Sequence, residues 1–247
     1  MEKVLLEICC GSLNDALEAQ LGGADRVELC SALFLGGLTP SAATIMEARA
    51  RLKIPFVAMV RPRSGGFCYS DAEMSVMERD AEFASASGAD GIVLGVLHDD
   101  GTVDVNRCKC LRTIAREQQA VFHRAFDVVP EPFRALDQLV DLGFTRILTS
   151  GQRKNAADGW ELISRLIDYA KGRIEIFPGG GIGPGNIRDV VARTGCNQVH
   201  LTAFKTCYDR STQRQPEIAF GAEGSPPETE YELTDRELVR SIVNLLA

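Results

Sequence analysis

Gly22-Gly23-Ala24-Asp25-Arg26-Val27 has two approximate copies further along the chain, Ser87-Gly88-Ala89-Asp90-Gly91-Ile92 and Leu142-Gly143-Phe144-Thr145-Arg146-Ile147. In each copy, a glycine typical of a helix end precedes a short turn, and the turn leads into the apolar start of a strand. A helix followed at once by a strand, repeated along a chain, predicts a parallel sheet with right-handed helical crossovers.

The same alternation extends over the rest of the sequence. Short runs rich in Val, Ile and Leu, typical of strands buried on both faces, recur with helical patterns between them. The runs cover residues 4–10, 26–30, 56–61, 91–95, 120–124, 146–150, 174–178 and 198–202. Eight such units in 247 residues predict the α/β class, as a single-domain (β/α)8 TIM barrel over residues 1–247. The open doubly wound sheet is disfavoured, because no glycine-rich dinucleotide fingerprint follows the first run.

The polar stretch 205–230 interrupts this alternation and contains Pro216, Pro226 and Pro227. We expect a long loop there after the eighth strand, either a functional cover of the catalytic face or partly disordered. Residues 232–246 are predicted to form the closing helix.

Composition excludes several classes of function. A net charge of −7 without a basic stripe argues against nucleic acid or an anionic membrane as partner, and no apolar run approaches the ~20 residues that span a bilayer. The first residues lack the pattern of a signal peptide, so we expect a cytoplasmic protein. The eight cysteines include no CxxC pair, which disfavours a structural zinc clamp, and a disulfide framework is not expected in a chain of this size. Apolar helix faces suggest a homo-oligomer, a dimer or larger.

Charged and polar residues interrupt the predicted strands near their carboxyl ends, where barrel enzymes hold their active sites. These residues are Glu7, Glu28, Arg61, His123 and His200. A single buried ion pair or a single strand histidine is often structural. Five such residues at one end favour a functional pocket, because burying several charges is costly unless they are paired.

The glycine run after the seventh strand is followed by a helix start at Pro184. Glycine lets backbone N–H groups approach an anion, although a tight turn would explain the run equally simply. The candidates for anion binding are Arg61, Arg63, Gly179, Gly180, Gly181, His200 and Thr202.

Two cysteines, Cys9 and Cys30, end neighbouring strands with side chains expected to point inward. Cys68 follows the third strand and could approach them. Soft sulfur ligands suit Cu(I), whereas an ordinary buried thiol is the simpler interpretation.

Several longer strings resemble the copper homeostasis protein CutC family from residue 5 to about residue 203. They are Ile8-Cys9-Cys10, the segments 23–30 and 36–41, Arg61-Pro62-Arg63, the segments 67–70 and 122–127, and Leu148-Thr149-Ser150-Gly151-Gln152. The resemblance implies a cytoplasmic, commonly oligomeric barrel associated with copper tolerance and proposed to bind Cu(I) through cysteine. It transfers most directly to Cys30, and by motif also to Cys9, Cys10 and Cys68. This chain departs from the family at residues 200–203, where Thr202 alone supplies a hydroxyl after the histidine.

Two functions therefore stand side by side. One is copper homeostasis through Cu(I) bound at the barrel mouth. The other is a lyase-like or isomerase-like enzyme acting on a small phosphorylated or carboxylated metabolite, with Arg61 binding the anion and Glu7, Glu28 or His123 acting as acid or base. Non-catalytic binding of a small anion is a third possibility. A copper carrier needs only two or three soft ligands, so the remaining charged residues favour a ligand beyond copper.

Overall fold

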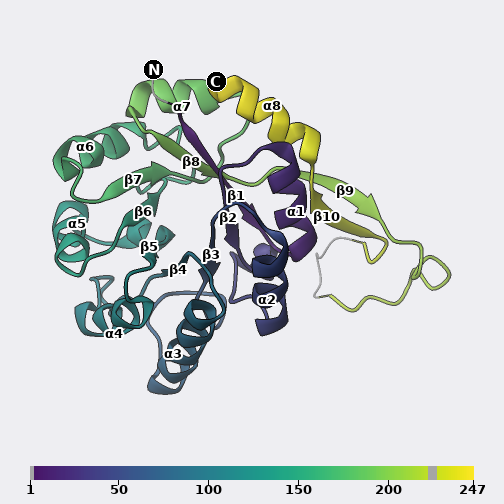
Figure 1. Cartoon of the computed structure of the whole chain (residues 1–247), viewed down its shortest axis with the longest axis horizontal. Coiled ribbons are helices and arrows are strands. Elements are labelled where there is room, and N and C mark those ends of the chain that lie inside the picture. The colour runs from purple at the N-terminus through teal and green to yellow at the C-terminus, as the bar shows by residue number, and fades with distance from the viewer. Residues whose placement is uncertain (1–2, 222–226) are drawn as a thin grey trace.

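The computed structural model describes residues 3–221 and 227–247, and its parallel strands follow one another in sequence order around a barrel (Figure 1). The barrel strands are β1 (Leu5–Cys10), β2 (Arg26–Leu29), β3 (Phe56–Met59), β4 (Gly91–Leu94), β5 (Gln119–Phe122), β6 (Arg146–Thr149), β7 (Glu175–Pro178) and β8 (Gln198–Leu201). Strand β1 pairs in parallel with both β2 and β8. An isolated bridge between Gly179 and His200 joins β7 to β8, so the barrel is nearly closed. The predicted single-domain (β/α)8 TIM barrel is confirmed.

Helices surround the strands as an outer ring (Figure 1). They are α1 (Leu13–Gly22), α2 (Ala42–Arg51), α3 (Asp71–Ala86), α4 (Val105–Ala115), α5 (Pro132–Asp141), α6 (Trp160–Ala170), α7 (Ile187–Thr194) and α8 (Arg236–Leu246), with short 3-10 helices η1 (Leu33–Leu35) and η2 (Arg124–Val128). Their ends follow the expected chemistry: the Ser12 hydroxyl accepts from the Asp15 amide, and Gly23 ends α1 with a φ of 98°. Across the described residues, no helix is both long and apolar enough to cross a bilayer.

Alternation along each strand separates the barrel interior from the layer between strands and helices. Cys9, Cys30, Met59 and Phe177 pack together in the interior, while Cys10 packs in the helix-facing layer. Residues two apart therefore share the interior, and this parity brings polar side chains from different strands into one space.

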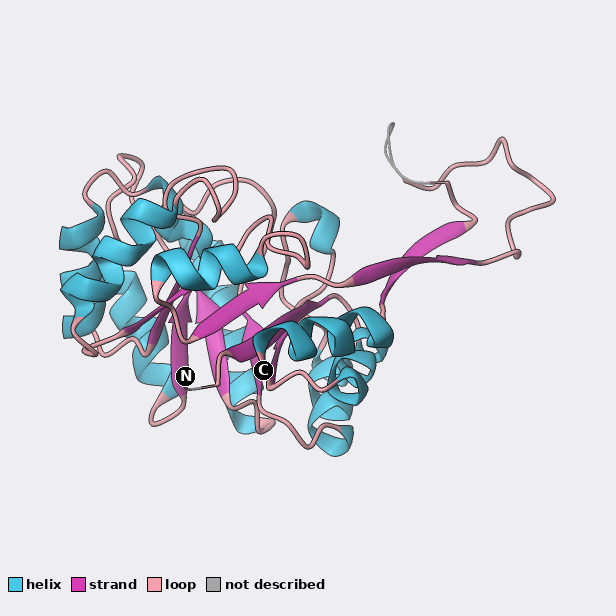
Figure 2. Cartoon of the chain, turned by 90° about the horizontal axis from the view of Figure 1, so that it is seen from above, coloured by secondary structure: helices cyan, strands magenta, loops and turns pink. Residues whose placement is uncertain are grey.

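The segment after β8 differs from the long loop expected over residues 205–230. Its ends form an antiparallel pair, β9 (Phe204–Tyr208) and β10 (Glu230–Thr234), and this arm projects away from the barrel (Figure 2). Residues 222–226 lie outside the described residues. The closing helix begins at Arg236 rather than at residue 232, because residues 232–234 pair with β9 and Asp235 caps the helix by accepting from the Glu237 amide.

Candidate functional site

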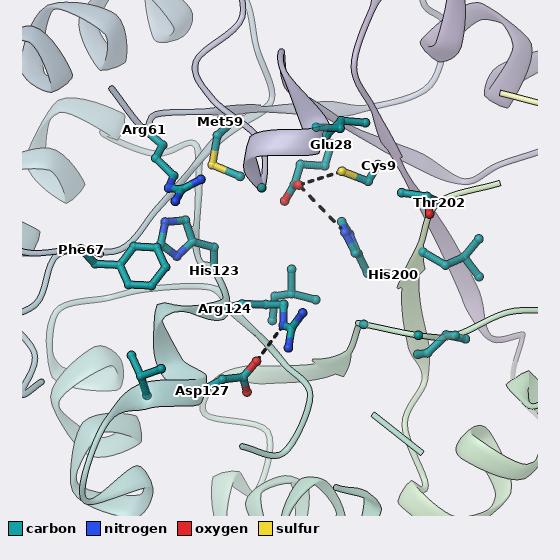
Figure 3. A pocket seen from close by; sticks show the side chains of 18 residues that line it. Cys9, Glu28, Met59, Arg61, Phe67, His123, Arg124, Asp127, His200 and Thr202 are labelled. Carbon is teal, nitrogen blue, oxygen red and sulfur yellow. Dashed lines mark hydrogen bonds and ion pairs between the residues drawn. The ribbon is translucent and has the colours of Figure 1, made fainter. Parts of the chain in front are cut away.

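A cavity of about 550 Å³ lies at the carboxyl ends of the barrel strands (Figure 3). Strands and loops from around the barrel contribute polar and apolar side chains to its wall. Its lining includes Cys9, Glu28, Leu33, Met59, Arg61, Phe67, His123, Arg124, Asp127, Leu148, Gly180, Gly181, Ile182, His200 and Thr202. No described residue between 204 and 234 belongs to this lining, so the described part of the arm does not act as the functional cover that was one of the two expectations.

One side of the cavity carries a cluster of two thiols and a carboxyl group. The Sγ atoms of Cys9 and Cys30 lie 3.4 and 3.5 Å from the same oxygen, Glu28 Oε1. Register explains the contact, because Cys9 on β1 pairs with Glu28 on β2, and Cys30 follows two residues later on the same face. The three potential ligand atoms lie within 4.8 Å of one another.

These contacts divide the protons of the cluster unequally. A hydrogen bond from Cys30 and the neighbouring His200 lower the pKa of Cys9 to about 5, against the opposing effect of burial. Burial and the charge on Cys9 raise the pKa of Glu28 to about 8. The hydrogen bond to Cys9 and burial hold the pKa of Cys30 well above its usual value. These contacts therefore favour ionisation of Cys9 over Cys30, and they make Glu28 hold its proton more tightly than an ordinary carboxyl group.

His200 on β8 connects this cluster to a charged layer beneath it. Its Nδ1 lies 2.8 Å from Glu7 Oε1, and its Nε2 lies 4.0 Å from Glu28 Oε1 (Figure 3). Burial disfavours the imidazolium, but the nearby Glu28 carboxyl group and hydrogen bonds to Cys9 and Glu7 outweigh it, so the pKa of His200 lies well above its usual value. The imidazolium thus balances the charge of the Cys9 thiolate.

Glu7 is held below the cavity by two buried arginines. Its Oε2 accepts from Arg26 Nε and, at 2.9 Å, from Arg146 Nη1. Burial raises the pKa of Glu7, but the charge of Arg26, the hydrogen bond with His200 and the charge of Arg146 together keep it well below its usual value. Glu7 is therefore an ionised partner that orients His200.

The opposite wall holds Arg61 and His123, with Phe67 packed against both (Figure 3). The Nδ1 atom of His123 accepts from the Ala125 amide at 3.1 Å, which places the ring proton on Nε2. Burial and the charge of Arg61 lower the pKa of His123 to about 3, so the ring is neutral. Gly95 makes room for it, since a Cβ there would lie 2.5 Å from His123 Cε1.

The structure brings most of the sequence-predicted residues into the cavity wall. These are Cys9, Glu28, Arg61, His123, Gly180, Gly181, His200 and Thr202, with Cys30 directly behind Cys9. Gly179 lies just outside the lining, where its missing side chain leaves room for His200: a Cβ there would lie 3.1 Å from His200 Cδ2.

Other predicted residues lie elsewhere. Cys10 faces the helix layer and donates to the Ile8 carbonyl at 3.6 Å, and burial raises its pKa well above the usual value. Cys68 is exposed and lies outside the thiol cluster. The Arg63 guanidinium pairs with Glu73 and donates to the Cys68 carbonyl at 2.9 Å, so it braces the loop rather than lining the cavity.

Sequence reasoning missed the buried arginines Arg26 and Arg146, which occupy the amino ends of their strands. This end of the barrel lies opposite the carboxyl ends of the strands, where functional residues are expected. Arg26 lies two residues before Glu28, and Arg146 lies two residues before Leu148, so each shares the inward face of its strand. This parity was the sequence signal that could have identified them.

Fold and site together define a (β/α)8 barrel with a thiol–carboxyl cluster at the mouth. Comparison with known proteins agrees: the model of the CutC family matches residues 4–205, and the chain belongs to this family. It is 46% identical to a CutC family protein of Treponema denticola over the full length of both chains. It is 43% identical to the human copper homeostasis protein cutC homolog, covering 96% of this chain and 87% of that protein.

A solved structure supports the assignment. The crystal structure of the copper homeostasis protein CutC from Streptococcus agalactiae matches with a TM-score of 0.78 at 38% identity. The match covers 81% of this chain and 98% of that chain.

Proposed function

We propose that this CutC family member binds Cu(I) through the thiolates of Cys9 and Cys30, with the Glu28 carboxyl group as a neighbouring third donor. The observation that carries the proposal is the convergence of two sulfur atoms and one carboxyl oxygen within 4.8 Å of one another. Thiolates are the soft ligands that favour Cu(I) over harder divalent ions. The name of the human relative, a copper homeostasis protein, supports the same metal.

The surroundings of the cluster suit a transferable metal. Cys9 lines the cavity, whereas Cys30 is fully buried behind it, so an ion would enter through Cys9. The hydrogen bond from Cys30 and the neighbouring His200 both lower the pKa of Cys9 and so favour its ionised form before the metal arrives. Binding would release the proton of Cys30, because a metal-bound thiol is deprotonated. We further propose that the protein works in the cytoplasm as a homo-oligomer, as the resemblance implied.

The test is the Cu(I) affinity of Cys9→Ser and Cys30→Ser, measured by competition with a chromophoric Cu(I) chelator under reducing conditions. Each variant should bind Cu(I) more weakly by well over a factor of ~10, because a hydroxyl is a poor ligand for a soft ion. Cys68→Ser is the matched control and should bind as the unaltered protein does. Unchanged affinity in both cluster variants would overturn the proposal.

A further inference from the structure

Arg61 is a buried cation without an acidic partner. It is 6% exposed and lines the cavity, yet among the described residues no carboxylate lies within 4.0 Å of its guanidinium group. Its Nη atoms donate instead to three loop carbonyls, those of Leu35, Gly37 and Gly65, at 2.8–3.0 Å. Carbonyl dipoles hold the group in place but leave its charge uncompensated, and a buried charge without a counter-ion is costly.

Arg61 and the neighbouring His123 each have one N–H group without a hydrogen-bond partner among the described residues. Arg61 Nε and His123 Nε2 are buried polar atoms with no hydrogen-bond partner in the described residues. Both residues belong to the same wall of the cavity (Figure 3). Both atoms are donors, because the ring proton of His123 is on Nε2 and Arg61 Nε carries a hydrogen. Arg61 Nε is also part of a positively charged guanidinium group.

The nearby Arg124 is a different case. Its Nε donates to Asp127 at 2.8 Å and its Nη2 donates to Ser150 at 2.8 Å, so its charge is already balanced. Of the two arginines that line the cavity, Arg61 is therefore the one whose charge lacks a counter-ion among the described residues.

We propose that the cavity binds a small organic oxyanion, whose carboxylate or phosphate group accepts hydrogen bonds from Arg61 Nε and His123 Nε2. Two donors on one wall of the cavity, one of them charged, match two oxygens of such a group. The neutral state of His123 matters little to the charge balance, since one guanidinium suffices for one negative charge. The anion-binding end of this site, at Arg61 and His123, lies apart from the thiol cluster and does not depend on copper binding.

The remaining wall indicates what the rest of the ligand looks like. Met59 and Leu148 supply apolar surface between the two sides of the cavity. On the far side, Glu28 Oε2 is another buried polar atom without a partner in the described residues. A hydroxyl group can pair with it whether that oxygen donates or accepts. The ligand class is therefore a small hydroxylated carboxylate or phosphate ester, within the size that 550 Å³ allows.

The test is thermal denaturation and equilibrium titration of the metal-free, reduced protein with two probes, inorganic phosphate and glycolate, against chloride at equal ionic strength. At least one probe should raise the melting temperature, and the identity of that probe tells phosphate from carboxylate. Arg61→Gln and His123→Phe should each weaken binding, Arg61→Gln by at least a factor of ~10, because a charge-assisted hydrogen bond is lost. Arg134→Gln removes the same charge from an exposed arginine outside the cavity and should bind normally.

Stabilisation by neither probe, or equal binding by the unaltered protein and both cavity variants, would overturn the proposal. If Arg61→Gln fails to fold, His123→Phe decides, since it keeps a ring against Phe67. The double variant Cys9→Ser/Cys30→Ser should lose Cu(I) affinity and still bind the effective probe. This result separates failure of the oxyanion site from failure of the copper site.

Discussion

Charged side chains occupy positions in this barrel interior that aliphatic residues usually fill. Glu7 is the centre of the lower layer, where it contacts Arg26, Arg146 and His200. Buried ion pairs add little net stability compared with a well-packed apolar core, but removing one partner leaves a buried charge without compensation. The role of Glu7 is to hold the His200 imidazolium beside Cys9, and its removal should therefore affect both stability and the thiol.

We predict that Glu7→Gln lowers the free energy of unfolding by roughly 3–5 kcal/mol, because two buried guanidinium groups lose their shared carboxylate. Urea denaturation at pH 7 measures this. Glu237→Gln is the matched control: Glu237 pairs with Arg240 on the surface, and its loss should change stability by less than about 1 kcal/mol.

The same network predicts how stability changes in acid. The pKa of Glu7 is lower in the folded chain than in the unfolded chain. Its contribution is therefore fully present above the unfolded pKa of about 4.3 and is lost as the pH falls from there through the folded pKa. Denaturation curves between pH 6 and pH 3 should show a smaller loss of stability in Glu7→Gln than in the unaltered protein. Parallel curves would argue against a salt-bridged Glu7.

At the scale of elements, helix ends set where each crossover begins, and α3 shows this most clearly. The Ser70 hydroxyl accepts from the Glu73 amide at 3.3 Å, and the Glu73 carboxylate accepts from the Ser70 amide at 2.7 Å. This reciprocal capping box fixes the helix start directly after the loop that carries Arg61, Arg63 and Phe67. Capping thus links a local sequence signal to the geometry of one cavity wall.

Ser70→Ala should destabilise the protein by about 1 kcal/mol through loss of the cap, with little effect on Cu(I) affinity. Ser75→Ala changes an exposed serine inside the same helix and should be neutral or slightly stabilising, because alanine has the higher helix propensity. Urea midpoints of the two variants compare directly. An equal response at both positions would show that the capping box contributes nothing.

At the scale of the whole molecule, the arm formed by β9 and β10 is the part that the barrel does not explain. An isolated two-stranded ribbon is marginally stable in water. This one is anchored at its base, where the Thr234 amide donates to Asp15 at 2.7 Å and the Asp235 amide donates to the Ala203 carbonyl at 2.7 Å. Beyond the base it exposes large apolar side chains, with Tyr208 72% and Phe220 79% exposed.

We predict that the protein is a homo-oligomer whose contacts include this arm. A projecting segment that exposes Tyr208, Ile218, Phe220 and Tyr231 is typical of an association surface. Light scattering coupled to gel filtration should give a mass above that of one chain. The double variant Tyr208→Ser/Phe220→Ser should lower that mass, whereas Phe34→Ser, an equally exposed change on the barrel itself, should leave it unchanged. A single-chain mass for the unaltered protein at all concentrations would refute the prediction.

The sequence by itself determined the barrel, because alternation of apolar runs and capped helices is a local property that each segment carries in its own residues. It also identified Cys9, Cys30, Glu28, Arg61, His123 and His200, since charged or reactive groups at inward positions near strand ends are visible in a strand pattern.

Only the tertiary structure decided which of these residues form the thiol cluster and which form the opposite wall of the cavity. Inter-strand register brought Cys9 and Cys30 to one carboxyl group, whereas the opposite orientation of Cys10 already follows from alternation along its strand. Partners distant in sequence hold Glu7 as a buried anion, whereas among the described residues none supplies a counter-ion to Arg61. The arm was also beyond sequence reasoning, because its two strands pair across the 21 residues from 209 to 229. Pairing across such distances depends on which surfaces meet, and a linear pattern does not encode that.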